Sequence, residues 1–370
     1  LFKIASNSKA MTAGVLARLV DAGKLKWDDP VTKYLPQFRM YDPWVTQQMQ
    51  VRDLLIHNSG LGLGAGDLML WPEPNRFTRA DIISGLQHLK PTHSFRSTYA
   101  YDNLLYVVAG EVAAAAGGVS YEELVKRELF QPLGLSRCQV GEWNREQVGN
   151  VAQPHMQTPQ GNRVIREDGD VIPDATSMAA GGIRCSLDDM LAWMRVWLSP
   201  DAQPAWLSPA QHRAVWTAHM PMPVSARMRV WDNSHFSAYG YGWRLSDVDG
   251  VWKVAHTGTL AGMYSSVILL PDQRAGIVIP INGDGEAART VLGQVLTKQF
   301  TAPSSSPTVA HYAGLLEQER TGERAAMPKP DTRHRTTAGV HALATWTGHY
   351  RDPWFGDVAL CPDGDRVRFL

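Results

Sequence analysis

The sequence lacks an excess of charge of either sign. Its 370 residues include 36 Lys and Arg against 36 Asp and Glu, so the formal net charge at pH 7 is zero. Proteins that hold a nucleic acid or an anionic membrane surface through their net charge carry a basic excess. No apolar run approaches the roughly 20 residues that span a bilayer. We therefore exclude nucleic acid as a partner and expect no membrane span.

Cysteine is scarce, and the common catalytic motifs are missing. Cys138, Cys185 and Cys361 lie far apart without a C-x-x-C pair, which excludes a zinc ribbon and leaves at most one disulfide bridge open. The sequence contains no G-x-S-x-G, H-E-x-x-H, Walker A or G-x-G-x-x-G motif. The twelve histidines show no metal-ligand spacing. We expect a protein without a metal site and without a cofactor.

What is present is the composition of a globular protein, with 44% hydrophobic and 19% charged residues. Apolar residues at helical spacing predict a mostly helical region over about 5–200, in which the Met- and Trp-rich stretch after Ser186 is interpreted as core. From residue 239 onward, turn signals at Asp249-Gly250 and at 271–274 predict two hairpins. A helix is expected to follow over about 286–300.

The C-terminal region predicts a second, smaller unit. A run rich in Pro and Ser at 301–307 is typical of a linker. We expect a catalytic domain over 1–302, a linker over 303–335 with a short helix at about 309–319, and the start of a β-barrel-like domain over 336–370. The chain opens on Leu1 and ends in an alternating, strand-like stretch, so we interpret it as a fragment cut at both ends.

The first candidate for chemistry is Ser6-Asn7-Ser8-Lys9, an S-x-x-K at the start of the first predicted helix. Residues three apart share one face of a helix, so the Lys9 amine comes within reach of the Ser6 hydroxyl. A serine hydroxyl is a weak nucleophile until a neighbouring base takes its proton, and a lysine with a lowered pKa can do so. The motif alone is weak evidence for catalysis, because a helix-capping serine followed by a solvated lysine gives the same sequence pattern.

Two further segments strengthen the prediction. Tyr101-Asp102-Asn103 precedes an apolar helix and combines a phenol that can move a proton with an amide that can hold a carbonyl chain. His256-Thr257-Gly258-Thr259 closes a predicted strand, where the glycine allows substrate to approach and the next backbone N–H can complete an oxyanion hole. We expect Ser6, Lys9, Tyr101 and His256 to meet in one cleft beside an edge strand.

In this order, the three motifs resemble those of the serine β-lactamase and penicillin-binding-protein superfamily. The closest likeness is to its class C-like branch, which holds D-aminopeptidases, D-alanyl-D-alanine carboxypeptidases and esterases. The resemblance covers about residues 2–300. It implies an α+β fold (an α/β sandwich), in which an antiparallel sheet is flanked by helices and joined to a mostly helical region. The N-terminal helix and two strands of that fold would be missing here, which would expose a sheet edge.

The resemblance also implies a role for each motif residue. Ser6 matches the acylated nucleophile, Lys9 its partner base and Tyr101 the general acid and base. The residues matched to substrate binding are Asn103, His256, Gly258 and Thr259, the last as the backbone oxyanion donor. Whether Lys9 or Tyr101 takes the first proton stays open. His57 is interpreted as part of a structural turn.

The implied function is hydrolysis of an amide or ester through an acyl-enzyme, with a small molecule or a peptide as substrate. The alternative is a non-catalytic relative that binds or senses peptidoglycan-type ligands. A periplasmic or secreted location would follow from the same resemblance, while the oligomeric state is left open.

One departure concerns His256, which stands where true β-lactamases have lysine. A neutral imidazole binds a carboxylate less strongly than an ammonium. We therefore expect short uncharged esters to be better substrates than carboxylate-bearing β-lactams.

Overall fold

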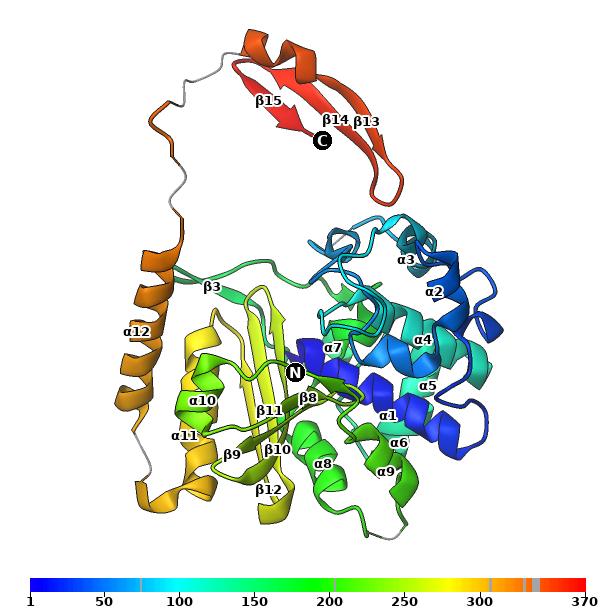
Figure 1. Ribbon diagram of the computed structural model, residues 1–370, viewed down its shortest axis with the longest axis vertical. Coiled ribbons are helices and arrows are strands. Elements are labelled where there is room, and N and C mark those ends of the chain that lie inside the picture. Colours follow the sequence, from blue (N-terminus) through cyan, green and yellow to red (C-terminus); the bar gives the residue numbers. More distant parts are fainter. Residues whose placement is uncertain (74, 203, 306–307, 329–330, 335–339) are drawn as a thin grey trace.

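The centre of the protein is an antiparallel sheet of six strands in the order β12-β11-β10-β9-β8-β7 (Figure 1). The computed structural model describes residues 1–73, 75–202, 204–305, 308–328, 331–334 and 340–370. The strands are β7 (Met220–Pro221), β8 (Ser237–Tyr239), β9 (Arg244–Val248), β10 (Val251–Leu260), β11 (Met263–Leu270) and β12 (Ala275–Ile281). Both predicted hairpins are present, and the α+β class is confirmed.

The turn chemistry explains the first hairpin. Asp249 and Gly250 have φ of 50° and 80°, the left-handed values that a two-residue turn of this hand requires and that Gly and Asp tolerate best. As a result Val248 pairs directly with Val251.

Helices cover both faces of the sheet. Alternate residues of a strand point to opposite sides. Accordingly, Ile268, Ile277 and Ile279 form a cluster on the face covered by α11 (Glu286–Thr301). On the other face, Gly276 of β12 lies against Met194 of α8 (Leu187–Leu198). The Met and Trp side chains of α8 are buried, which confirms their interpretation as core.

The helical region lies on the α8 side of the sheet and centres on α1 (Ser8–Asp21) and α4 (Leu104–Gly117). Figure 1 shows it on the right, with further helices around these two. They are α2 (Pro43–Gln48), α3 (Arg79–Gly85), α5 (Tyr121–Val125), α6 (Gln131–Leu133), α7 (Arg145–Val148) and α9 (Pro209–Val215). The short helix α10 (Ala226–Asp232) lies instead on the left, beside α11. No single helix among the described residues has the length and apolar composition of a membrane span; the consecutive pair 104–117 and 121–133, bent by 77°, meets that test only jointly.

Short strand pairs lie within the region predicted to be helical. They are β1 (Phe2–Lys3) with β6 (Arg184–Cys185), β2 (Trp143–Asn144) with β5 (Val171–Ile172), and β3 (His155–Thr158) with β4 (Gly161–Val164). These pairs are too short for hydrophobic alternation to reveal them in the sequence.

The single disulfide bridge that the sequence left open is formed between Cys138 and Cys185. Cys185 pairs with Phe2 across β1 and β6, so the bridge anchors the strand that leads into Ser6.

The helix after the predicted linker is longer than expected. The sequence indicated a short helix of about 309–319, whereas α12 covers Val309–Ala326. Its Tyr312 and Leu316 are buried against Trp231 and Val291, so this segment packs on α10 and α11. The prediction missed this because both partners are distant in the sequence.

A three-stranded sheet ends the chain, made of β13 (Gly348–Asp352), β14 (Gly356–Asp363) and β15 (Arg366–Phe369). The loop between β13 and β14 contacts the segment before α3, since the rings of Phe355 and Phe77 are 5.6 Å apart. The predicted boundary at residue 336 lies outside the described residues.

We predict that the disulfide stabilises the protein by about 2–4 kcal/mol, because it closes a loop of 47 residues in the unfolded chain. Urea unfolding of a Cys138→Ala/Cys185→Ala variant measures this. Cys361→Ala, which removes a free cysteine, is the matched control and should leave the midpoint unchanged. Equal midpoints for both variants would contradict the prediction.

Candidate active site

Ser6 lies on a short 3-10 turn, η1 (Ala5–Asn7), between β1 and α1. Two hydrogen bonds fix this turn to the sheet: Ser265 Oγ donates to the carbonyl of Ile4 at 2.7 Å, and Asn7 Nδ2 donates to Ser265 Oγ at 2.8 Å. Ala5 has a φ of 49°, an unfavourable value for a residue with a side chain. The chain is thus held in a sharp bend that presents Ser6 to a cavity.

Gly258 of β10 permits this bend to approach the sheet. A Cβ at this position would collide with the backbone carbonyl of Ile4 and with Ser265, and would lie 2.9 Å from the Ala5 side chain. The sequence predicted that this glycine makes room for substrate. In the structure it makes room for the turn that carries Ser6.

Lys9 is fully buried, and three oxygens surround its amine. Nζ donates to Ser6 Oγ at 3.2 Å, to Asn103 Oδ1 at 2.7 Å and to the Ala180 carbonyl at 2.7 Å. It also lies over the ring of Tyr101, 4.9 Å from the centroid. All three donors of the ammonium are therefore satisfied inside the protein.

Burial lowers the pKa of Lys9 to about 7. Asp67 opposes this shift, Arg244 adds to it, and Asp102 opposes it. Desolvation destabilises the charged form of a buried amine, which explains the direction. Near neutral pH a substantial fraction of Lys9 is therefore neutral.

Asn103 links Lys9 to a carboxylate that the sequence reasoning did not identify. Asn103 Nδ2 lies 3.1 Å from both oxygens of Asp67, while Oδ1 accepts the hydrogen bond from Lys9. Asp67 follows Gly66, whose φ of 76° starts the short turn η4 (Asp67–Met69). Burial raises the pKa of Asp67, against the hydrogen bonds from Asn103 and the charge of Lys9.

Tyr101 faces Ser6 from the segment before α4. Burial raises the pKa of Tyr101 to about 12, against the charge of Arg244 and an interaction with the Ser6 side chain. The phenol is therefore protonated at neutral pH. The segment is held by His57, whose Nδ1 accepts from the backbone N–H of Asp102 at 3.1 Å. This contact agrees with the structural interpretation of His57.

His256 is buried and does not line the cavity. Its Nδ1 lies 2.8 Å from the Thr257 carbonyl, and its Nε2 lies 2.8 Å from the hydroxyl of Tyr239. Since a carbonyl can only accept, Nδ1 carries the proton and Nε2 accepts from Tyr239. Burial holds the pKa of His256 well below its usual value, so the ring is neutral. Both nitrogens are occupied inside the protein.

The cavity in front of Ser6 has a volume of about 770 Å³. Of the predicted site residues, its lining includes Ser6, Tyr101, Asn103 and Thr259. β9 pairs with β10 only from Val251 to Ala255, so beyond Ala255 this side of β10 is no longer covered by β9. Thr257 and Thr259 line the cavity from that stretch. A strand edge beside a nucleophile offers backbone groups to an extended substrate.

The lining also contains charged residues that the sequence reasoning missed. They are Lys3, Asp67, Glu73, Arg166, Asp168 and Arg244. Nothing in the local sequence distinguishes them from surface charges. The one signal is at Arg244, where a charge stands between the apolar residues Trp243 and Leu245. No group of three or more His, Cys, Asp or Glu in the described ranges is arranged to hold a metal ion.

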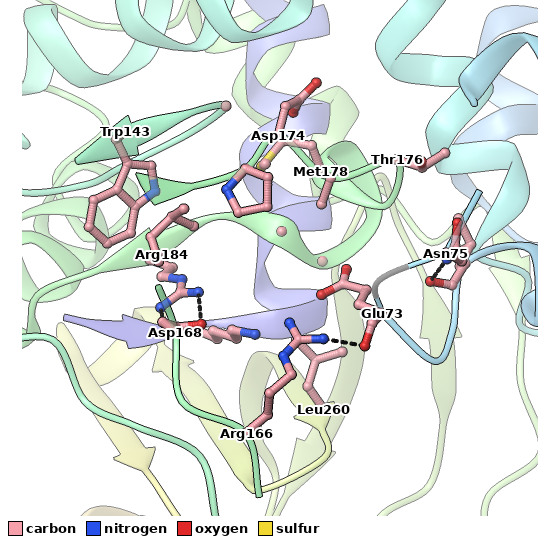
Figure 2. Close-up of a pocket in the computed structure, with 18 residues that line it drawn as sticks. Glu73, Asn75, Trp143, Arg166, Asp168, Asp174, Thr176, Met178, Arg184 and Leu260 are labelled. Carbon is pink, nitrogen blue, oxygen red and sulfur yellow. Dashed lines mark hydrogen bonds and ion pairs between the residues drawn. The ribbon is translucent and has the colours of Figure 1, made fainter. Parts of the chain in front are cut away.

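A side chamber of about 230 Å³ adjoins the main cavity and shares Lys3, Glu73, Arg166 and Asp168 with it. Figure 2 shows Asp168 and Arg184 joined, with Trp143 beside Arg184. This ion pair is buried, with an N–O distance of 2.6 Å. On the other side of the chamber Arg166 donates to the backbone carbonyl of Glu73. The chamber enlarges the cavity, and its walls carry charged groups of both signs.

Comparison with known proteins gives a consistent result. The family model described as Beta-lactamase matches residues 1–299. The chain is 26% identical over 297 residues to the unguisins hydrolase ungD' of Aspergillus campestris, which covers 76% of this chain and 52% of that protein. It is 25% identical over 333 residues to penicillin-binding protein 4 of Amycolatopsis lactamdurans, covering 86% and 85%. The chain thus spans about half the length of the first relative and most of the second.

Two solved structures share the fold. The octameric penicillin-binding protein homologue from Pyrococcus abyssi superposes with a TM-score of 0.69 at 21% identity, covering 100% of this chain and 75% of that one. The D-amino acid amidase from Ochrobactrum anthropi SV3, complexed with L-phenylalanine amide, has a TM-score of 0.61 at 23% identity and covers 76% of each chain. At these identities the likeness establishes the architecture.

We predict that Gly258→Ala destabilises the protein by about 1–3 kcal/mol, because the added methyl group must push β10 away from the Ile4 carbonyl. Chemical denaturation measures the change. Gly283→Ala is the matched control, since a Cβ there meets no atom within 4 Å. Equal stabilities of the two variants would show that the close approach is not required.

Proposed function

The chain belongs to the β-lactamase family, and from that premise we propose that it is a serine hydrolase that forms an acyl-enzyme at Ser6 on an amide or ester substrate. The observation that carries the proposal is the set of partners around the Lys9 amine. Two of its three neighbours, Asn103 Oδ1 and the Ala180 carbonyl, can only accept hydrogen bonds. Only the Ser6 hydroxyl can also donate.

This difference between the three partners directs the lone pair of neutral Lys9 toward the Ser6 hydroxyl. A neutral amine keeps two N–H donors and gains one lone pair. The two donors stay with the two carbonyl-type acceptors, so the lone pair faces Ser6 Oγ at 3.2 Å, within reach for proton transfer. The lowered pKa of Lys9, about 7, makes this form accessible at neutral pH. We therefore assign Lys9 as the base of acylation, a choice that the sequence left open.

During acylation one proton leaves Ser6 and one reaches the leaving group. Lys9 takes the proton of Ser6 while Oγ bonds to the substrate carbonyl carbon, and the carbonyl electron pair moves to its oxygen. The backbone N–H groups of Ser6 and Thr259 are suited to hold that oxyanion. When the intermediate collapses, the bond to the leaving group breaks. Tyr101, which is protonated, gives the leaving group its proton and recovers one from Lys9.

Deacylation reverses these roles with water. Water attacks the acyl carbon and Lys9 accepts its proton. Ser6 Oγ then leaves and takes that proton from Lys9. The products are a carboxylic acid and the free enzyme. Asp67 acts through Asn103, whose amide it orients so that Oδ1 faces Lys9. Asp67 is thus a positioning residue.

The alternative of a non-catalytic ligand-binding relative shares the fold and the cavity. The contacts of Lys9 with Ser6 and Asn103 favour the hydrolase, because a binding protein does not need a buried, deprotonatable amine beside a hydroxyl. Ligand binding without turnover would support the alternative.

We predict that Ser6→Ala lowers the hydrolysis of p-nitrophenyl butyrate by about 10³-fold or more, as expected for the loss of a covalent nucleophile. Denaturing mass spectrometry should detect a butyryl adduct on the wild type and none on the variant. Ser84→Ala, on the exposed surface of α3, is the control and should keep full activity. An adduct on the Ser6→Ala protein would place the nucleophile elsewhere.

We predict that kcat/KM rises with pH through an apparent pKa of about 7, because Lys9 must lose its proton to act as the base. Burial also raises the pKa of Asp102 to about 7, so Asp102→Asn is the necessary control. The acidic limb should persist in Asp102→Asn and move to lower pH, because the charge of Asp102 raises the pKa of Lys9. Disappearance of the limb in this variant would assign it to Asp102.

A further inference from the structure

The charges that line the side chamber beside the catalytic cavity balance one another. Three cationic side chains face three anionic ones: Lys3, Arg166 and Arg184 against Glu73, Asp168 and Asp174. Figure 2 shows the two labelled arginines and the three carboxylates around the same space. A ligand group of either sign therefore meets as many like charges as opposite ones, and like charges brought together are costly. The chamber favours a group without net charge.

Most of the charged groups are already paired inside the protein. Arg184 donates to both oxygens of Asp168, at 2.6 Å and 3.1 Å, and both side chains are 5% exposed. Asp174 forms an ion pair with Arg79 at 2.9 Å. Since a buried ion pair is costly to break, these groups are fixed parts of the wall.

Two groups at the opening of the chamber keep unused hydrogen-bonding capacity. Lys3 and Glu73 line both the chamber and the main cavity. Within the described ranges of the chain, the Lys3 amine has no hydrogen-bond or ion-pair partner. Glu73 accepts from the Ser177 hydroxyl at 3.0 Å through one oxygen, and its other side-chain oxygen is unpaired among the described residues.

The unused donor and the unused acceptor lie near each other. The charge of Glu73 acts on Lys3 and opposes the lowering of its pKa by burial, yet no ion pair joins the two in the described part of the chain. A hydroxyl group both accepts and donates hydrogen bonds. One hydroxyl between the two residues, or two on neighbouring carbons, can accept from the Lys3 amine and donate to the Glu73 carboxylate.

The rest of the chamber wall is largely apolar. It contains five aliphatic or thioether side chains and one indole: Leu70, Ile172, Pro173, Met178, Leu260 and Trp143. Its volume of about 230 Å³ lies below that of pockets that hold whole drug-sized ligands, so it suits a single ring. A saturated ring with hydroxyl groups on its rim, such as a pyranose, presents C–H faces to apolar walls and hydroxyls to polar ones.

The chamber is joined to the catalytic residues through its floor. Gly181 of η7 (Met178–Gly182) belongs to that floor, and the carbonyl of the preceding residue, Ala180, accepts from Lys9. Leu260 lines both the chamber and the main cavity. A substrate with its scissile bond in the main cavity can therefore place the adjoining group in the chamber.

We propose that the side chamber binds an uncharged, polyhydroxylated ring, so that the enzyme hydrolyses esters or amides that carry a sugar-like group next to the scissile bond. The inference rests on the proposed hydrolase function and names a substrate class for it. Lys3 and Glu73 are the specificity-determining residues, as donor to and acceptor from the ring hydroxyls. Hydrogen bonds with an ionised partner are roughly twice as strong as neutral ones.

Two pairs of esters that differ only in the hydroxyl groups of one ring test the proposal. The first pair carries the ring on the acyl side, as the p-nitrophenyl esters of cyclohexanecarboxylic acid and of its trihydroxy derivative. The second carries it on the alcohol side, as the butyrate esters of cyclohexylmethanol and of the primary hydroxyl of methyl glucoside. Lys3→Met should lower kcat/KM for the hydroxylated member of at least one pair by roughly 10-fold or more, and for the plain ring by less than about threefold.

Matched variants separate this site from general effects. Lys90→Met removes an exposed lysine that lines neither cavity and should leave both ratios unchanged. Glu73→Leu removes the acceptor and should lower the same ratio as Lys3→Met, so it tests the proposal if Lys3→Met fails to fold. A ring with a carboxylate or an ammonium group in place of one hydroxyl should be a poorer substrate than the hydroxylated ring.

The outcomes separate this inference from the proposed function. Equal hydroxylated-to-plain ratios in wild type and Lys3→Met, for both pairs, would overturn the inference while hydrolysis through Ser6 stands. An equal loss for both members would overturn it too, because Lys3 would then act on the bend that carries Ser6. A preference for a charged ring over the hydroxylated one would likewise overturn it.

Binding tests the chamber independently of turnover. Methyl glucoside should give saturation-transfer difference signals in NMR spectra of the wild type and of Ser6→Ala, and these signals should be lost in Lys3→Met. Equal signals with and without the Lys3 amine would overturn the inference. Absence of any turnover that depends on Ser6 would instead defeat the proposed function.

Discussion

The burial of a single ammonium group, that of Lys9, is the constraint on which the rest of the site depends. An amine taken out of water is costly unless every donor finds an acceptor. The three acceptors come from three separate parts of the chain: Ser6 on η1, Asn103 before α4, and Ala180 in η7 (Met178–Gly182). Satisfying Lys9 therefore fixes Ser6, the start of α4 and the η7 turn relative to one another. The same burial lowers the pKa of Lys9, so the interaction that organises the site also prepares Lys9 for its proposed role as the base.

Two glycines allow the backbone segments around Ser6 and Lys9 to pack closely together. Gly258 lets β10 contact the turn of Ser6, and Gly242 lets the link between β8 and β9 contact α1 at Lys9. In both cases the nearest neighbour of the absent side chain is backbone, which cannot move aside as a flexible side chain could. The sheet is thus brought close to the chain at Ser6 and at Lys9.

The sequence predicted the features that depend on local rules. Asp249-Gly250 and its flanking strands were recognisable because the turn restricts φ at two adjacent residues, and the order of the three motifs indicated which side chains meet. It could not predict the orientation of His256, because the hydroxyl of Tyr239 that occupies its Nε2 comes from another strand. Asp67 and Arg244 were missed for a related reason. Asp67 matters because it binds Asn103, and Arg244 because it lies near Tyr101 where the pairing of β9 with β10 ends. These contacts join residues that are distant in the sequence.

The charges around Lys9 also set its readiness to act as the proposed base. Arg244 lowers the pKa of Lys9, whereas Asp67 raises it. In the free enzyme this balance keeps much of the amine neutral and ready to accept a proton.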